Sequence, residues 1–166
     1  FHGGGLAKLL MNSVKIVKSE KKAVIFASYV KSPENFGIVH LGENNNILSI
    51  EEKPTKPKSN FAVVGLYFYP NNVIQIAKNV KPSKRGELEI TSVNQMYLKN
   101  EDLILTKLSR GYAWLDSGTH ESLTEATEFV KAVEKRTGLK IACLEEIALI
   151  KNYISKSKLS EQIKNF

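Results

Sequence analysis

The sequence predicts one α/β domain over residues 1–166 that ends in a helical tail at 143–166. Apolar residues recur at helical spacing near both ends of the chain, and runs of β-branched and aromatic residues lie between them. The sequence contains no internal repeat, no low-complexity segment and no long linker. Because a chain of 166 residues can bury one core, we expect a single folded unit.

The first half of the chain is expected to form one helix and then several strands. Apolar residues between Leu6 and Val17 follow the spacing of an amphipathic helix. The segment GENNN at 42–46 is rich in residues that tolerate positive φ, so it predicts a turn that joins two strands in a hairpin. The clearest strand pattern is FAVVGLYFY at 61–69, which is closed by a proline. Two earlier strands are expected at 23–30 and 37–41.

The second half is expected to be mainly helical. Ser92 and Gln95 have the spacing of a capping box, which predicts that a helix starts at Ser92. That helix should turn three large side chains inward, namely Val93, Met96 and Tyr97. We also expect a short helix at 71–76, a strand at 103–108, a long helix capped by Thr119 and ended by Gly138, and two helical pieces after Cys143.

The composition limits the classes of function. No run of about 18 apolar residues is present, so we expect neither a membrane-embedded protein nor a membrane partner. Cys143 is the single cysteine, which excludes an internal disulfide and fits a reducing, cytoplasmic compartment. The net charge of +7 favours an anionic partner, either nucleic acid or a small phosphorylated metabolite. The scattered lysines lack the interleaved aromatic residues of a nucleic-acid groove, so the metabolite is the stronger interpretation.

The stretch Glu51-Glu52-Lys53-Pro54 breaks the pattern of the hydrophobic strand that it ends. Side chains alternate along a strand, so Leu48, Ile50 and Glu52 are expected to share the apolar face. A carboxylate on that face either reaches solvent at the end of the strand or has a partner that offsets its desolvation. Residue order alone leaves both alternatives open.

Two further segments carry candidate binding residues. Arg85 lies in the polar segment PSKRGELEI, and its planar guanidinium suits a phosphate or carboxylate, although a plain surface arginine is the alternative. In YAWLDSGTH at 112–120, a short strand containing Trp114 is expected to deliver Asp116 to the edge of the sheet where α/β proteins bind ligands. An aspartate that merely caps the following helix is the other interpretation.

Five segments of the sequence, taken in order, form a recognisable set: ENFGIV at 34–39, SIEEKPTKPKSNFAVVGLYFY at 49–69, KPSKRGELEIT at 81–91, RGYAWLDSGTHESLTEA at 110–126 and LEEIAL at 144–149. Together they strongly resemble bacterial glucose-1-phosphate thymidylyltransferases, and the resemblance covers nearly the whole chain. It implies a partial Rossmann-like nucleotide-diphospho-sugar transferase fold, with a mixed sheet and flanking helices. It also implies that dTTP and glucose 1-phosphate are joined to give dTDP-glucose and pyrophosphate, in dTDP-rhamnose type polysaccharide biosynthesis.

The resemblance assigns a role to each candidate residue. Lys53 and Arg85 are implied as the catalytic residues that hold the sugar phosphate, and Asp116 as one of two carboxylates that bind Mg²⁺. A phosphate oxygen is already anionic at neutral pH, so the reaction needs its repelling anions aligned and neutralised rather than a general base. The implied substrate-binding set is Phe36, Gly37, Glu52, Lys53, Val63, Tyr67 and Arg85.

The family's glycine-rich triphosphate loop and base-reading residues are not found in this sequence. We therefore expect this chain to be the C-terminal, sugar-phosphate-binding portion of such an enzyme and to be inactive alone. Relatives assemble as homotetramers, so a homo-oligomer is implied. A non-catalytic sugar-phosphate-binding or subunit-interaction module is the alternative, and a basic nucleic-acid-binding domain is a weaker one.

Overall fold

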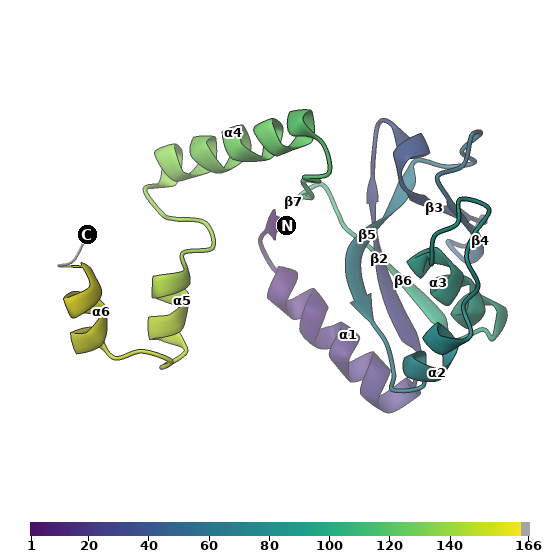
Figure 1. Cartoon of the computed structure of the whole chain (residues 1–166), viewed down its shortest axis with the longest axis horizontal. Coiled ribbons are helices and arrows are strands. Elements are labelled where there is room, and N and C mark those ends of the chain that lie inside the picture. Colours follow the sequence, from purple (N-terminus) through teal and green to yellow (C-terminus); the bar gives the residue numbers. More distant parts are fainter. Residues whose placement is uncertain (164–166) are drawn as a thin grey trace. The chain divides into compact units, whose positions relative to one another are not determined.

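A mixed five-stranded sheet forms the centre of the first of two compact units in this chain. The computed structural model describes residues 1–163, and the two units are Phe1–Trp114 and Leu115–Phe166 (Figure 1). The order of the strands is β4-β3-β5-β2-β6, in which β2 and β6 run parallel and the other neighbours antiparallel. Their bounds are β2 Ala23–Tyr29, β3 Gly37–Leu41, β4 Ile47–Glu52, β5 Phe61–Phe68 and β6 Leu103–Lys107. The mixed sheet that the resemblance implied is confirmed, as is the hairpin β3-β4.

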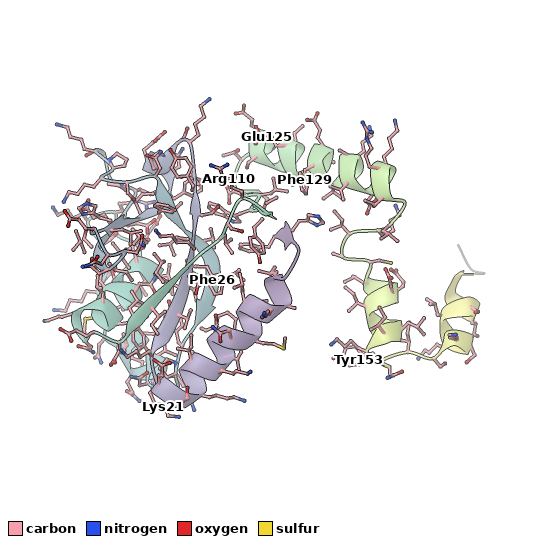
Figure 2. The ribbon with its side chains drawn as sticks, turned by 180° about the vertical axis from the view of Figure 1, so that it is seen from behind. Lys21, Phe26, Arg110, Glu125, Phe129 and Tyr153 are labelled. Carbon is pink, nitrogen blue, oxygen red and sulfur yellow. The ribbon has the colours of Figure 1, made fainter. Side chains whose placement is uncertain are left out.

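Helices cover both faces of this sheet. Helix α1 (Leu6–Glu20) packs on the face that carries Val24 and Phe26, and Figure 2 marks Phe26 on β2. Helices α2 (Val73–Lys78) and α3 (Ile90–Lys99) pack on the other face. Since β2 is buried on both faces, its nearly continuous apolar sequence is explained by a central position between two helical layers.

The alternation of side chains expected along β4 is wrong for the first residues of the strand. Ile50 is buried as expected, but Leu48 is 53% exposed and Ile47 packs on the core instead. The cause is an irregularity in the pairing of β3 with β4 between His40 and Leu41, where one extra residue shifts the side chains to opposite faces. Beyond this bulge the alternation is regular, so Glu52 does share the face of Ile50.

The capping box expected at Ser92 is also wrong. Helix α3 starts at Ile90, its N-cap residue is Glu89, and Gln95 donates from Nε2 to the Ile50 carbonyl at 2.7 Å. Val93 and Tyr97 are buried, but Met96 is 45% exposed. The helix begins earlier than the polar spacing suggests. Its buried residues are Thr91, Val93, Asn94 and Tyr97, and Met96 lies outside this set.

Trp114 does not lie in a strand of the main sheet, contrary to expectation. Strand β7 (Tyr112–Ala113) has two residues, pairs only with β1 (His2–Gly3), and ends before Trp114. A side chain at Gly3 would meet the Tyr112 ring, because an added Cβ would lie 2.4 Å from its Cδ1 atom. The segment that leads to Asp116 is therefore a separate two-stranded ribbon rather than the end of a sheet strand.

The second unit is helical and contains α4 (His120–Thr137), α5 (Leu144–Ile150) and α6 (Lys156–Ile163). Thr119 caps α4 by accepting the backbone N–H of Ser122, and Gly138 ends the helix with φ of 72°. The long helix and the two later pieces are confirmed, while residues 164–166 of the expected tail lie outside the described residues. A single domain over the whole chain stays a prediction. Within the described residues, every helix is too short or too polar to cross a membrane.

Candidate functional site

The Glu52 carboxylate lies at the centre of a small polar cluster at the end of β4. Thr91, in the first turn of α3, donates its hydroxyl hydrogen bond to Glu52 Oε2. Gly37 is paired with Glu52 across the hairpin, and a Cβ at Gly37 would lie 3.2 Å from Oε2 and 3.1 Å from Thr91 Oγ1. Val63 lies beside the same position, 4.0 Å from it. Glu52 is therefore half-buried and partnered rather than a solvated strand end.

Tyr67 also faces this cluster. Its ring is half-buried on β5, and burial raises the pKa of its hydroxyl, with the nearby Glu52 charge raising the pKa further. The hydroxyl therefore stays protonated at neutral pH. A neutral donor beside a carboxylate acceptor is a pair of groups suited to the hydroxyls of a sugar.

Lys53, directly after β4, has an unusual backbone conformation. Its φ is 40°, in the left-handed region, and its backbone N–H donates to the Phe36 carbonyl at 3.0 Å. Phe36 follows the 3₁₀ helix η1 (Pro33–Asn35), and its ring packs on Trp114 at 5.1 Å between centroids. The Lys53 side chain is exposed and has no ion pair with any residue described here. Its charge is therefore available to an anionic ligand.

Arg85 is attached to the start of α3. Its guanidinium pairs with Glu87 at 3.1 Å and with Glu89, the N-cap residue of α3, at 3.6 Å. Ser83 also donates to Glu89, at 3.0 Å. These pairs hold Arg85 near the helix that carries Thr91, but the Arg85 side chain is 41% exposed and such exposed pairs are weak. Within the described part of the chain, Arg85 and Lys53 share no ion-pair partner.

Asp116 belongs to the second unit. Its exposed carboxylate accepts the backbone N–H of Gly118 at 3.1 Å through Oδ2, and the cap of α4 is Thr119 instead. The plain capping interpretation of Asp116 is therefore wrong. Among residues 1–163, no group of three or more His, Cys, Asp or Glu side chains gathers in a way that could hold a metal ion.

Comparison with known proteins identifies the family. The profile of the family described as nucleotidyl transferase matches residues 6–133, which include the cluster around Glu52. The chain belongs to the nucleotidyl transferase family. The chain is 55% identical over 139 residues to the glucose-1-phosphate thymidylyltransferase of Neisseria meningitidis serogroup A, and the match covers 84% of this chain and 48% of the relative.

A second relative extends the match to almost the whole chain. The glucose-1-phosphate thymidylyltransferase of Mycobacterium tuberculosis strain H37Rv is 46% identical over 162 residues, 98% of this chain and 55% of the relative. The resemblance drawn from the five motifs is thus confirmed. The chain spans about half the length of the curated relatives that it matches.

Solved structures agree on the fold of this chain. A structure titled as a glucose-1-phosphate thymidylyltransferase from Bacillus anthracis, in complex with a sucrose, superposes with a TM-score of 0.63 at 39% identity. It covers 72% of this chain and 47% of that one. An apo UDP-glucose pyrophosphorylase superposes with a TM-score of 0.65 over 81% of this chain and 51% of its own, but at 21% identity it shows the fold alone.

Thr91 belongs to the cluster around Glu52, but the residue patterns did not predict it. It lies 39 residues from Glu52 in the sequence, and a threonine in the first turn of a helix is ordinarily explained by helix structure. The only available signal was the lone carboxylate on an apolar strand face, which required a donor from some other element. The structure identifies that donor.

Replacing Thr91 with valine should lower the free energy of unfolding by about 1.5 kcal/mol or more, because a half-buried carboxylate loses a charge-assisted hydrogen bond. Urea unfolding followed by circular dichroism measures this. Ser19→Ala is the control, since the exposed Ser19 hydroxyl donates to the Lys15 carbonyl of its own helix. An equal decrease in the free energy of unfolding in both variants would contradict the role of Thr91 as the partner of Glu52.

Proposed function

We propose that the protein containing this chain is a glucose-1-phosphate thymidylyltransferase that joins glucose 1-phosphate to dTTP and releases pyrophosphate. The observation that carries the proposal is the identity of 46–55% to proteins of that name, over a span that includes the Glu52 cluster. This chain would supply the sugar-phosphate-binding side of the site. The residues that hold the triphosphate would come from outside this sequence.

The cluster would bind the sugar through paired donors and acceptors. The free lone pairs of Glu52 would accept sugar hydroxyls, and the protonated Tyr67 hydroxyl would donate to one. Gly37 leaves room beside Glu52, because a side chain there would meet the carboxylate and Thr91 within 3.2 Å. Phe36 and Val63 would provide the apolar border against which a sugar ring packs.

Lys53 and Arg85 would neutralise the sugar phosphate during transfer. The attacking phosphate oxygen carries a negative charge and approaches a second anionic group, so cations that cancel the repulsion lower the barrier most in the transition state. Lys53 is free of ion pairs in the part of the chain that the structure describes, whereas Arg85 would exchange its acidic partners for the phosphate. No group on this chain needs to act as a general base.

Asp116 would hold Mg²⁺ with the substrate phosphates. Mg²⁺ commonly takes only one or two protein carboxylates and completes its shell with water and phosphate oxygens, so a single exposed aspartate fits this ion. When bound, Mg²⁺ supplies charge neutralisation and in-line alignment of the phosphates. We expect EDTA to abolish turnover and Asp116→Asn to raise the Mg²⁺ concentration for half-maximal rate by about tenfold or more.

The proposal is tested by incubating the whole protein with glucose 1-phosphate, dTTP and Mg²⁺ and measuring pyrophosphate and dTDP-glucose. Parallel reactions with UTP and with galactose 1-phosphate determine the base and the sugar. Isothermal titration with glucose 1-phosphate, with and without Mg²⁺, separates binding from turnover. Binding without product in any of these reactions would favour the non-catalytic sugar-phosphate-binding or subunit-interaction module.

We also propose that the protein acts in the cytoplasm as a homotetramer, without nucleic-acid or membrane partners. A single cysteine and scattered lysines support the compartment and the small-molecule partner. The tetramer is carried over from the family. Light scattering coupled to size-exclusion chromatography would measure the assembly.

A further inference from the structure

Three tyrosines form a continuous stack that runs from the proposed site into the core. Tyr67 lies near the end of β5 and Tyr69 directly follows that strand, and their rings are 6.0 Å apart with an interplanar angle of 8°. The Tyr69 ring stacks in turn on Tyr97 of α3, at 5.4 Å and 20°. Tyr97 is 1% exposed, so the stack ends in a rigid part of the molecule.

The inner two rings are each held by a side-chain amide. Tyr69 donates its hydroxyl to Asn94 Oδ1 at 2.5 Å, and Tyr97 donates to Asn72 Oδ1 at 2.7 Å. Asn94 is completely buried. These bonds define the planes of the Tyr69 and Tyr97 rings, because each ring is held both at its faces and at its hydroxyl.

Tyr67 differs from the two inner tyrosines. Its hydroxyl forms no hydrogen bond with any of the described residues, so nothing but packing determines where its ring lies. The parallel face of Tyr69 is the aromatic surface that it packs on. The Tyr67 hydroxyl is therefore free for a ligand, while its orientation depends on the ring behind it.

We propose that Tyr69 is a positioning residue, which fixes the Tyr67 ring by stacking so that the Tyr67 hydroxyl stands beside Glu52 to meet a sugar hydroxyl. This inference rests on the proposed function. Tyr69 itself does not touch the sugar, because its hydroxyl is occupied by Asn94. The positioning depends on the aromatic face of Tyr69, and the bond to Asn94 serves mainly to hold that face in place.

Two substitutions separate the ring of Tyr69 from its hydroxyl. Tyr69→Leu removes the stacking surface and should raise KM for glucose 1-phosphate by about three- to tenfold, the range that an aromatic pair contributes. The kcat and the KM for dTTP should stay within about twofold of the unaltered protein. Tyr69→Phe keeps the ring and should leave the KM for glucose 1-phosphate unchanged, although it lowers stability by leaving Asn94 without a donor.

A double-mutant cycle in the whole protein gives the decisive comparison. If Tyr69 acts through Tyr67, Tyr69→Leu should have no further effect on KM in a protein that already carries Tyr67→Ala. Tyr29→Leu is the matched control, because it removes another aromatic contact in the same sheet, an edge-to-face pair with Phe61, and should not change KM.

An equal rise in KM for Tyr69→Leu with and without Tyr67 would overturn the positioning role, as would an unchanged KM. Should Tyr69→Leu fail to fold, a raised KM in Tyr69→Phe would still overturn it, and an unchanged KM would support it. Lack of any turnover of glucose 1-phosphate by the unaltered protein would instead overturn the proposed function, and the inference with it.

Discussion

Replacement of Lys53 by methionine should lower kcat/KM for nucleotidyl transfer by about a thousandfold or more, the effect of losing a cation that clamps a transferring phosphate. Methionine keeps most of the length and the apolar stem of lysine and removes only the charge. The left-handed backbone at Lys53, tied to the Phe36 carbonyl, should stay in place because it does not involve the side chain. Steady-state kinetics with glucose 1-phosphate and dTTP measures the change.

The control for this experiment is Lys58→Met, in the same loop. Lys58 forms an exposed ion pair with Glu51 at 3.3 Å, so its charge is already partnered, and an exposed pair contributes little to stability. The two variants change the net charge of the protein equally. A large loss of activity in Lys53→Met, with near-normal activity in Lys58→Met, would show that the charge matters at position 53 and not merely through the net charge. Near-normal activity in both would refute the phosphate-binding role of Lys53.

The regular parts of the first unit could be predicted because each one has a strong local pattern. β3 has the bounds that its sequence indicates, and β2, β5 and β6 each end one residue before the expected position. Asn45, in the turn between β3 and β4, has φ of 57°, as the GENNN sequence suggests. In these places local preference and tertiary structure agree, so residue order is sufficient.

The errors occur where a residue outside the element decides the local structure. The bulge in β4 depends on how its first residues pair with β3, and the pairing moves Ile47 inward in place of Leu48. The start of α3 depends on Glu89, whose carboxylate is held by Ser83 and Arg85 rather than by a cap bond. Neither the strand pairing nor the side-chain bonds of Glu89 leave a mark in the apolar or polar spacing, although Ser83 and Arg85 lie close to Glu89 in the sequence.

In the candidate site, too, one part could be predicted from local sequence and another could not. A carboxylate on an apolar strand face identified Glu52 as exceptional, since a buried charge requires a partner. The partner could not be identified, because Thr91 reaches Glu52 only after α3 packs across the sheet. The roles of Lys53, Arg85 and Asp116 came from the resemblance, and their convergence on one phosphate stays a prediction.

Replacement of Phe26 by alanine should lower the free energy of unfolding by about 3–5 kcal/mol, the range for deleting a large aromatic side chain from a packed core. Phe26 is fully buried in the middle of β2, lies 6.1 Å from the Phe68 ring, and packs in the cluster formed with α1. The cavity would lie between the sheet and α1, on the face opposite α3. Guanidinium unfolding, compared at equal m-values, measures the loss.

Tyr29→Ala provides the matched control, since it removes an aromatic ring from the same strand at a position that is 68% exposed. Its loss should stay below about 1.5 kcal/mol, the contribution of its edge-to-face contact with Phe61. Because the Glu52 cluster lies on the α3 face, folded Phe26→Ala protein should keep its KM for glucose 1-phosphate. A loss for Phe26→Ala no larger than that of the control would mean that α1 does not pack on β2 in solution.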